Sequence, residues 1–129
     1  MSAPQIGLIE RRTEIVFPND ANALGTLFGG KALSMMDITA GIAAMRACRK
    51  QVVTASMDRT DFKQPIFVGE FAETIARVIA IGRTSLTIDV ELWAEHPTSG
   101  ERRLSTVSRF VMVAVDAHGK PTSILAEEP

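Results

Sequence analysis

The glycine-rich segment 25–31 has the residue types and spacing of a phosphate-binding loop. Gly25 and Gly30 are separated by four residues and followed by Lys31, but residue 32 is alanine, so the hydroxyl that would bind Mg²⁺ is missing. No alternation of strands and helices follows the segment, which argues against nucleotide hydrolysis. A glycine-rich loop that opens a helix still exposes unpaired backbone N–H groups, and these can polarise a carbonyl or hold an anion.

Asp37 is the only carboxylate in the helix predicted to follow these glycines, and its neighbours are Met35, Met36 and Ile38. It follows Gly30 by seven residues, which in an α-helix is a rotation of about 700°, within about 20° of two full turns. The two residues should therefore lie on one face and could address one ligand. A carboxylate buried there would have a raised pKa unless hydrogen bonds compensate, which suits a general base. An acid on a solvated strip, or one bound to a backbone N–H, fits the helix pattern equally well.

Asn22, His96 and His118 are polar residues for which a structural role is sufficient. Asn22 lies in the turn-rich stretch 18–22, and taken alone it is predicted to be a turn residue. The two histidines adjoin turn signals, and no Cys or Glu lies at metal-ligand spacing from either. We therefore expect both to be solvated loop side chains and predict no metal site.

Cys48 and Arg83 could each take part in chemistry, although simpler interpretations exist. Cys48 lies near the end of the predicted helix beside two arginines, which could lower the pKa of its thiol. A lone cysteine in an apolar helix usually fills space, so we assign it no catalytic role. The segment 82–85 is predicted to be a hairpin turn, and Arg83 within it is either solvated or able to meet a phosphate.

The candidate acid must be positioned by a helix, which is predicted over residues 31–50. This segment is rich in Ala, Leu, Met and Ile, contains no Pro, and has Arg46, Arg49 and Lys50 in its last turn, where cations favour the helix dipole. Its residues are small or apolar around most of its circumference, which is typical of a buried helix that other backbone approaches closely. We therefore expect another element to wrap it.

β-rich segments flank this helix in the sequence. A short β-prone run over residues 13–17 stops at Pro18, and further strands are predicted over residues 52–62, 71–81, 85–95 and 104–116. Ile88, Val90 and Leu92 alternate with outward-facing neighbours, so one face of their strand should be buried. Long strands joined by short turns imply an antiparallel sheet. We predict one α+β domain, residues 1–129, whose sheet curls around the helix.

Composition excludes several classes of protein. The chain has 129 residues, enough for one core, with 14 basic and 15 acidic residues and a formal net charge of -1. This balance argues against nucleic acid or an anionic membrane as a partner. One Cys and two His cannot form an internal disulfide or, without carboxylates, a zinc site, which favours a cytoplasmic location. Its longest uncharged stretch, 21–30, is too short to span a bilayer, and the amino terminus lacks the charge order of a secretory signal.

A set of motifs extends along the chain, from about residue 12 to residue 121. They are FPNDAN at 17–22, a glycine at 25, FGGKALSMMD at 28–37, VVT at 52–54, TDF at 60–62, a proline at 65, VGE at 68–70 and VDAHGKP at 115–121. Together they closely resemble the hotdog-fold acyl-CoA thioesterases, in particular the bacterial short- and broad-chain acyl-CoA hydrolases and the related cytosolic brain acyl-CoA hydrolase. The similarity covers nearly the whole chain, so it is more specific than any single motif.

The resemblance implies a long helix wrapped by an antiparallel sheet, with two such domains paired through their sheets and active sites at the dimer interface. Asp37 would act as general base or nucleophile, and the backbone N–H groups of Gly29 and Gly30 would polarise the thioester carbonyl. Asn22 would come from the opposing protomer to position water or substrate, and Thr54 would be a supporting polar group near Asp37. Hydrolysis would need neither a metal nor a bound organic cofactor.

Substrate contacts and assembly also follow from the resemblance. Basic surface residues would meet the nucleotide of CoA, and we nominate Arg83, with Thr84 and Ser85, for phosphate contact. We expect a homodimer, or a hexamer built as a trimer of dimers, with acyl-CoA as substrate. Acyl-chain length would depend on the packing of five apolar side chains, and the sequence alone does not predict it: Met35, Met36, Ile38, Phe62 and Phe67.

Two other functions stay open. A hotdog dehydratase or hydratase generally relies on a histidine, and neither His96 nor His118 is predicted near the start of the helix. A non-catalytic acyl-CoA-binding module would retain the pocket. Binding alone does not require a base, so the presence of Asp37 favours the hydrolase.

Overall fold

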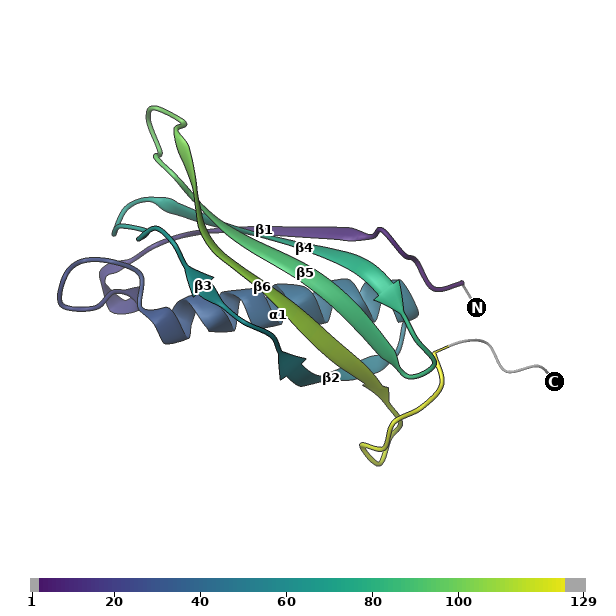
Figure 1. The fold of residues 1–129 in the computed structure, drawn as a ribbon. Coiled ribbons are helices and arrows are strands. Elements are labelled where there is room, and N and C mark those ends of the chain that lie inside the picture. The colour runs from purple at the N-terminus through teal and green to yellow at the C-terminus, as the bar shows by residue number, and fades with distance from the viewer. Residues whose placement is uncertain (1–2, 125–129) are drawn as a thin grey trace.

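The structure is a computed structural model that describes residues 3–124. One long helix, α1 (Gly29–Cys48), packs against one face of a six-stranded antiparallel sheet that curls around it (Figure 1). The strand order is β1-β4-β5-β6-β2, and the short strand β3 pairs with β6. The predicted α+β class is confirmed. The other elements are β1 (Ile9–Ile15), the 3₁₀ turn η1 (Pro18–Asp20), β2 (Gln51–Met57), β3 (Asp61–Phe62), β4 (Phe71–Ile81), β5 (Ser85–Glu95) and β6 (Arg102–Val115).

The hydrophobic core lies between α1 and the concave face of the sheet. On β5, Ile88, Val90 and Leu92 are buried, and the residues between them lie on the convex face, as the alternation predicted. Strands β4 and β6 contribute alternate residues in the same way because they flank β5 in register. The largest side chains of this core include Phe110, Met35, Met36, Leu86 and Met112.

Helix α1 begins two residues earlier than predicted. Its first residues are Gly29 and Gly30, and Phe28 is the N-cap residue, with its own N–H donated to the carbonyl of Asp20 at 2.8 Å. Because glycine has a low helix propensity, the sequence predicted that the helix starts after both glycines, at Lys31. The helix ends at Cys48, where Arg49 takes a left-handed conformation with φ 55°.

Three predicted strands have different boundaries in the structure. The run 13–17 is part of a longer strand, β1, that ends at Ile15, and the last strand begins at Arg102 and ends at Val115. The predicted strand 52–62 is two strands, β2 and β3, because a bulge between Thr54 and Ser56 and the polar segment 58–60 interrupt its pairing with β6. The segments 71–81 and 85–95 match their predictions, as does the hairpin turn between them.

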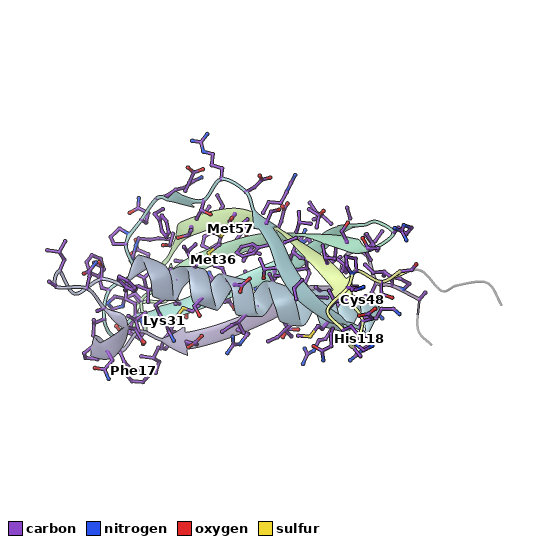
Figure 2. All side chains as sticks on the ribbon, turned by 90° about the horizontal axis from the view of Figure 1, so that it is seen from below. Phe17, Lys31, Met36, Cys48, Met57 and His118 are labelled. Carbon is purple, nitrogen blue, oxygen red and sulfur yellow. The ribbon has the colours of Figure 1, made fainter. Side chains whose placement is uncertain are left out.

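One side of the helix and one edge of the sheet are open in the single chain. Strand β2 is an edge strand, and all its residues except Val52 are exposed. Figure 2 views the molecule from the side of α1, with the sheet behind the helix. On this open side Ser34 is exposed and Ile38 is 48% exposed, so the predicted wrapping of the helix is incomplete.

Candidate active site

A pocket opens between α1 and the edge of the sheet, with a volume of about 390 Å³. This volume is within the range of small-molecule sites. Helix residues spaced three or four apart form one wall, and residues of β2 and β6 form the other. Gly30 and Asp37 both line it, as the seven-residue spacing predicted. The lining residues are Gly30, Leu33, Ser34, Asp37, Thr54, Met57 and Phe110.

Asp37 is the one carboxylate among the lining residues, and it is half-buried. Thr54 on β2 donates a hydrogen bond of 2.6 Å from Oγ1 to Asp37 Oδ1. The other carboxylate oxygen, Oδ2, accepts no hydrogen bond from the part of the chain that the structure describes. A short bond to a charged acceptor orients the carboxylate and leaves Oδ2 able to take a proton from a bound molecule.

Thr54 reaches Asp37 because of the way β2 pairs with β6. Thr54 lies opposite Met112, whose Sδ is 3.4 Å from Thr54 Oγ1, and the bulge follows directly after Thr54. A bulge re-aims side chains and often occurs at strand edges beside functional sites. The threonine hydroxyl is thus held between the sheet core and the acid of the helix.

The first turn of α1 supplies backbone donors at the same pocket. Gly29, Gly30 and Lys31 are its first three residues, and N–H groups at such positions have no acceptor within a helix. A Cβ on Gly30 would lie 2.7 Å from a ring carbon of Phe28, so glycine allows this close approach. Gly29 itself does not line the pocket. The helix start therefore presents donors and the positive end of the dipole near Asp37.

None of the five side chains expected to set acyl-chain length lines this pocket, and their effect on chain length stays a prediction. Met35 and Met36 are buried in the core, and Ile38, Phe62 and Phe67 are exposed and do not line the pocket. Its apolar walls are Leu33, Met57 and Phe110 instead.

The sequence analysis also missed Ser34, although it is on the same helix face as Gly30 and Asp37, so helical spacing could have identified it. Met57 and Phe110 carry no such local signal. They meet the pocket because Met57 pairs with Phe110 across β2 and β6.

Asn22 has the turn role that its sequence context predicted. Its Nδ2 donates to Thr26 Oγ1 at 2.8 Å, and its Oδ1 accepts from the N–H groups of Leu24 at 2.9 Å and Thr26 at 3.2 Å. The side chain is exposed and does not line the pocket of its own chain. Its approach to the acid of an opposing protomer stays a prediction.

Arg83 and Thr84 lie in the hairpin turn between β4 and β5, and Ser85 is the first residue of β5. The carbonyls of Arg83 and Thr84 accept hydrogen bonds from Ile124 at 2.7 Å and from Ala114 at 2.8 Å. None of the three lines the pocket of Asp37. Their contact with a CoA phosphate stays a prediction.

The histidines and the cysteine lie away from the pocket. His96 and His118 are exposed in turns, and His118 is at the opposite end of α1 from Lys31 (Figure 2). Cys48 is buried. Within residues 3–124, no three His, Cys, Asp or Glu side chains are grouped so that they could hold a metal ion. In the same range, no helix combines the length and apolar character needed to cross a bilayer.

Glu70, which is buried, and Arg103, which is partly exposed, form an ion pair beside the loop that packs against the segment before α1. Arg103 donates from Nη2 to Glu70 Oε1 at 2.7 Å and from Nη1 to Oε2 at 3.0 Å. The N–H of Phe67 also donates to Glu70 Oε1, at 2.9 Å. The hydrogen bonds from Arg103 lower the pKa of Glu70 more than its burial raises it, and the N–H of Phe67 lowers it further.

The stability of the protein should reflect this lowered pKa at acid pH. The ionised Glu70 stabilises the folded state above pH 4.5, its ordinary pKa, and that contribution is lost as the pH falls through the lowered pKa. The difference in unfolding free energy between the wild type and Glu70→Gln should therefore be largest near neutral pH and shrink below pH 4.5. Urea unfolding across this pH range measures it. An equal difference at neutral and strongly acid pH would contradict the prediction.

The chain is similar in sequence to proteins named acyl-CoA thioester hydrolases. It is 36% identical over 129 residues to the acyl-CoA thioester hydrolase YciA of Escherichia coli, covering 98% of this chain and 96% of that protein. It is 42% identical over 113 residues to the uncharacterized acyl-CoA thioester hydrolase YkhA of Bacillus subtilis. That match covers 88% of this chain and 66% of the length of YkhA.

Solved structures extend the likeness to the fold. The acyl-CoA hydrolase of Staphylococcus aureus, in complex with butyryl coenzyme A, coenzyme A and coenzyme A disulfide, has a TM-score of 0.84 at 33% identity, over 91% of this chain and 71% of that one. The hexameric thioesterase of Yersinia pestis has a TM-score of 0.83 at 38% identity, over 91% of this chain and 94% of that one. The predicted hotdog fold is confirmed.

The family model that matches the sequence is described as the thioesterase superfamily, and it covers residues 24–101. This range includes the glycine loop, all of α1, Asp37 and Thr54. With relatives above 30% identity over most of the chain, the family assignment has support from both sequence and fold. The chain belongs to the thioesterase superfamily.

Proposed function

We propose that the protein hydrolyses acyl-CoA thioesters to a free acid and CoA. The observation that carries this proposal is the 2.6 Å hydrogen bond that orients Asp37 in a pocket lined by the first turn of α1. A thioester has a good leaving group, so its hydrolysis needs mainly an oriented water and stabilisation of the developing oxyanion. The names of the relatives from E. coli and B. subtilis point to the same reaction.

In this mechanism Asp37 acts as general base. Its Oδ2 takes a proton from water, and the water oxygen attacks the thioester carbonyl carbon. The N–H groups of Gly29 and Gly30 donate to the resulting oxyanion. When the tetrahedral intermediate collapses, the C–S bond breaks, the CoA thiolate takes the proton held by Asp37 and leaves as the thiol, and the acid retains the water oxygen. Alternatively an Asp37 carboxylate oxygen attacks the carbonyl carbon, the C–S bond breaks and CoA leaves, which gives a mixed anhydride. Water then hydrolyses the anhydride at the Asp37 carboxyl carbon, so after a single turnover in H₂¹⁸O the label is in Asp37 and the product acid is unlabelled.

Solved structures of alanine variants of the S. aureus enzyme support the choice of residues. In that protein an asparagine, an aspartate and a threonine were each replaced by alanine, and the three positions are 15 and 17 residues apart. Asn22, Asp37 and Thr54 have the same residue types and the same spacing. We therefore assign them to one site, with Thr54 orienting the base.

We further propose that the functional unit is a homodimer, assembled into a hexamer in the cytoplasm. The open edge of β2 and exposed apolar residues such as Phe28, Ile38 and Val53 offer surface for a second copy. The Yersinia pestis relative is hexameric. In such a dimer the partner's copy of residue 22 would approach Asp37, and Arg83 would contact a CoA phosphate.

The test of the function is release of free thiol from acetyl-, hexanoyl- and palmitoyl-CoA. We expect turnover with at least one of these substrates, and an unchanged rate after dialysis against EDTA because no metal is required. No turnover on any chain length would reject the hydrolase, and tight acyl-CoA binding without hydrolysis would favour the non-catalytic module. A hydratase is disfavoured because neither His96 nor His118 lines the pocket.

Thr54→Ala should lower kcat about tenfold with little change in KM. The substitution removes a charge-assisted hydrogen bond worth about 1.5–3 kcal/mol, and its main effect is to let the Asp37 carboxylate rotate. Thr54→Ser retains the hydroxyl and should recover most of the rate. Steady-state thiol-release kinetics measure both variants. Equal losses for alanine and serine would show that the methyl group, and not the hydroxyl, is what matters.

A further inference from the structure

Two loops meet beside the start of α1 and are joined by backbone hydrogen bonds. Loop A, residues 20–28, carries Asn22 and ends at Phe28, the N-cap residue of the helix. Loop B, residues 63–70, lies against it. The N–H of Leu27 donates to the carbonyl of Ile66 at 2.6 Å, and the N–H of Val68 donates to the carbonyl of Gly25 at 3.0 Å. The position of loop A is therefore coupled to that of loop B.

The side chains of Glu70 and Arg103 hold loop B through hydrogen bonds. Glu70 is 6% exposed and is the only charged residue among the buried residues that the structure describes. Besides its two bonds to Glu70, Arg103 donates from Nη2 to the carbonyl of Pro65 at 3.0 Å, and its guanidinium carbon is 5.8 Å from the centre of the Phe67 ring. One arginine thus contacts the beginning, the middle and the end of loop B.

The backbone of Gly69 and Glu70 also ties loop B to Val16, the residue that follows β1. The N–H of Val16 donates to the carbonyl of Glu70 at 3.0 Å, and the N–H of Gly69 donates to the carbonyl of Val16 at 2.8 Å. Position 70 therefore holds both the side-chain pair and the backbone link to the segment that leads into η1 and loop A.

We propose that the Glu70–Arg103 pair is a positioning device that holds loops A and B, and through them the first turn of α1, in the geometry that catalysis requires. The inference rests on the hydrolase function proposed above. Neither residue lines the pocket, so both act through the loops. An ion pair withdrawn from water adds little net stability compared with apolar residues of the same size, but the bidentate geometry of this partly buried pair specifies one arrangement. Arginine is suited to this role because its planar fork engages both oxygens of Glu70.

The adjacent Arg102 provides a matched control. Successive residues of a strand point to opposite faces, so Arg102 lies on the convex face, where it pairs with Glu73 at 2.7 Å and Glu95 at 2.8 Å. The residue types and distances match those of the buried pair. Within residues 3–124, neither Arg102 nor Glu73 forms a hydrogen bond to loop A or loop B.

The experiment compares Glu70→Gln with Glu73→Gln in the full chain, by thiol-release kinetics and amide hydrogen exchange at a temperature where both are folded. For Glu70→Gln we expect kcat to fall about tenfold, KM to change less than about threefold, and the amides of Leu27 and Val68 to exchange at least about tenfold faster. Glu73→Gln should stay within about twofold of the wild type in every measurement.

Arg103→Lys is a second, milder variant that is used in case Glu70→Gln folds poorly. It keeps the positive charge opposite Glu70 but loses the bidentate hydrogen bonds. It should show the same loss of kcat in a smaller degree. Wild-type kcat in Glu70→Gln, or unchanged exchange in loops A and B, would overturn the positioning role. If the wild type hydrolyses no acyl-CoA, the proposed function fails, but the exchange comparison still tests whether the pair holds the loops.

Discussion

Replacing Asp37 by asparagine should lower kcat for acyl-CoA hydrolysis by at least about a hundredfold, the size expected for loss of a general base. Asparagine has the same shape and can still accept the hydrogen bond from Thr54, so the pocket should remain intact. The amide cannot take a proton from water. Free-thiol release under saturating substrate gives kcat. The melting temperature of the variant serves as the control for folding, and a rate within about threefold of the wild type would rule out Asp37 as the base.

Mixing Asp37→Asn with Asn22→Ala tests whether one site uses two chains. In a twofold-symmetric dimer, a mixed pair would contain one site with both substitutions and one site with neither. Random reassociation of two inactive variants should then restore roughly a quarter of the wild-type activity. If both residues act within one chain, mixing restores nothing, because each chain contains a defective site.

Met36→Ala should have the largest effect on stability. Met36 is adjacent to Asp37 but points into the core, where its exposed fraction is 0%. Truncating a fully buried methionine removes apolar contacts and leaves a cavity, which costs about 2–5 kcal/mol. Urea unfolding at fixed protein concentration measures this free energy, since the stability of an oligomer depends on concentration.

Met36→Leu is the control for that measurement. Leucine has a similar volume and should cost less than about 1.5 kcal/mol. A large loss for leucine as well would mean that the site depends on the shape of methionine and not on filled volume. A loss under about 1 kcal/mol for Met36→Ala would mean that the helix relaxes against the sheet and closes the cavity.

Features that depend only on the helix or strand repeat within one segment were predictable from the sequence. The alternation on β5 and the placement of Gly30 and Asp37 on one helix face follow from residue spacing alone, because strand and helix periods are local properties of the backbone. Helix and strand boundaries were less predictable. The helical conformation of Gly29 and Gly30 depends on neighbouring segments and not on residue type, and so does the bulge after Thr54.

Pairs brought together by register could not be predicted in this way. Phe110 and Met57 line the pocket because β2 and β6 pair with one particular register. Glu70 and Arg103 meet across 33 residues of sequence, and no local pattern marks them as partners. The motif resemblance suggested Thr54 as a neighbour of Asp37, but the 2.6 Å contact depends on how the helix lies across the sheet.

The sequence by itself determined a single long helix, an antiparallel sheet and one acid placed over a glycine-rich helix start. The tertiary structure alone decided the hydrogen bond between Thr54 and that acid, which apolar side chains form the pocket, and that Glu70 pairs with Arg103 beneath the neighbouring loops. The physical reason is that helix and strand periods are set within a segment of a few residues. Contacts between segments are set by strand register and packing, which emerge only when the whole chain has folded.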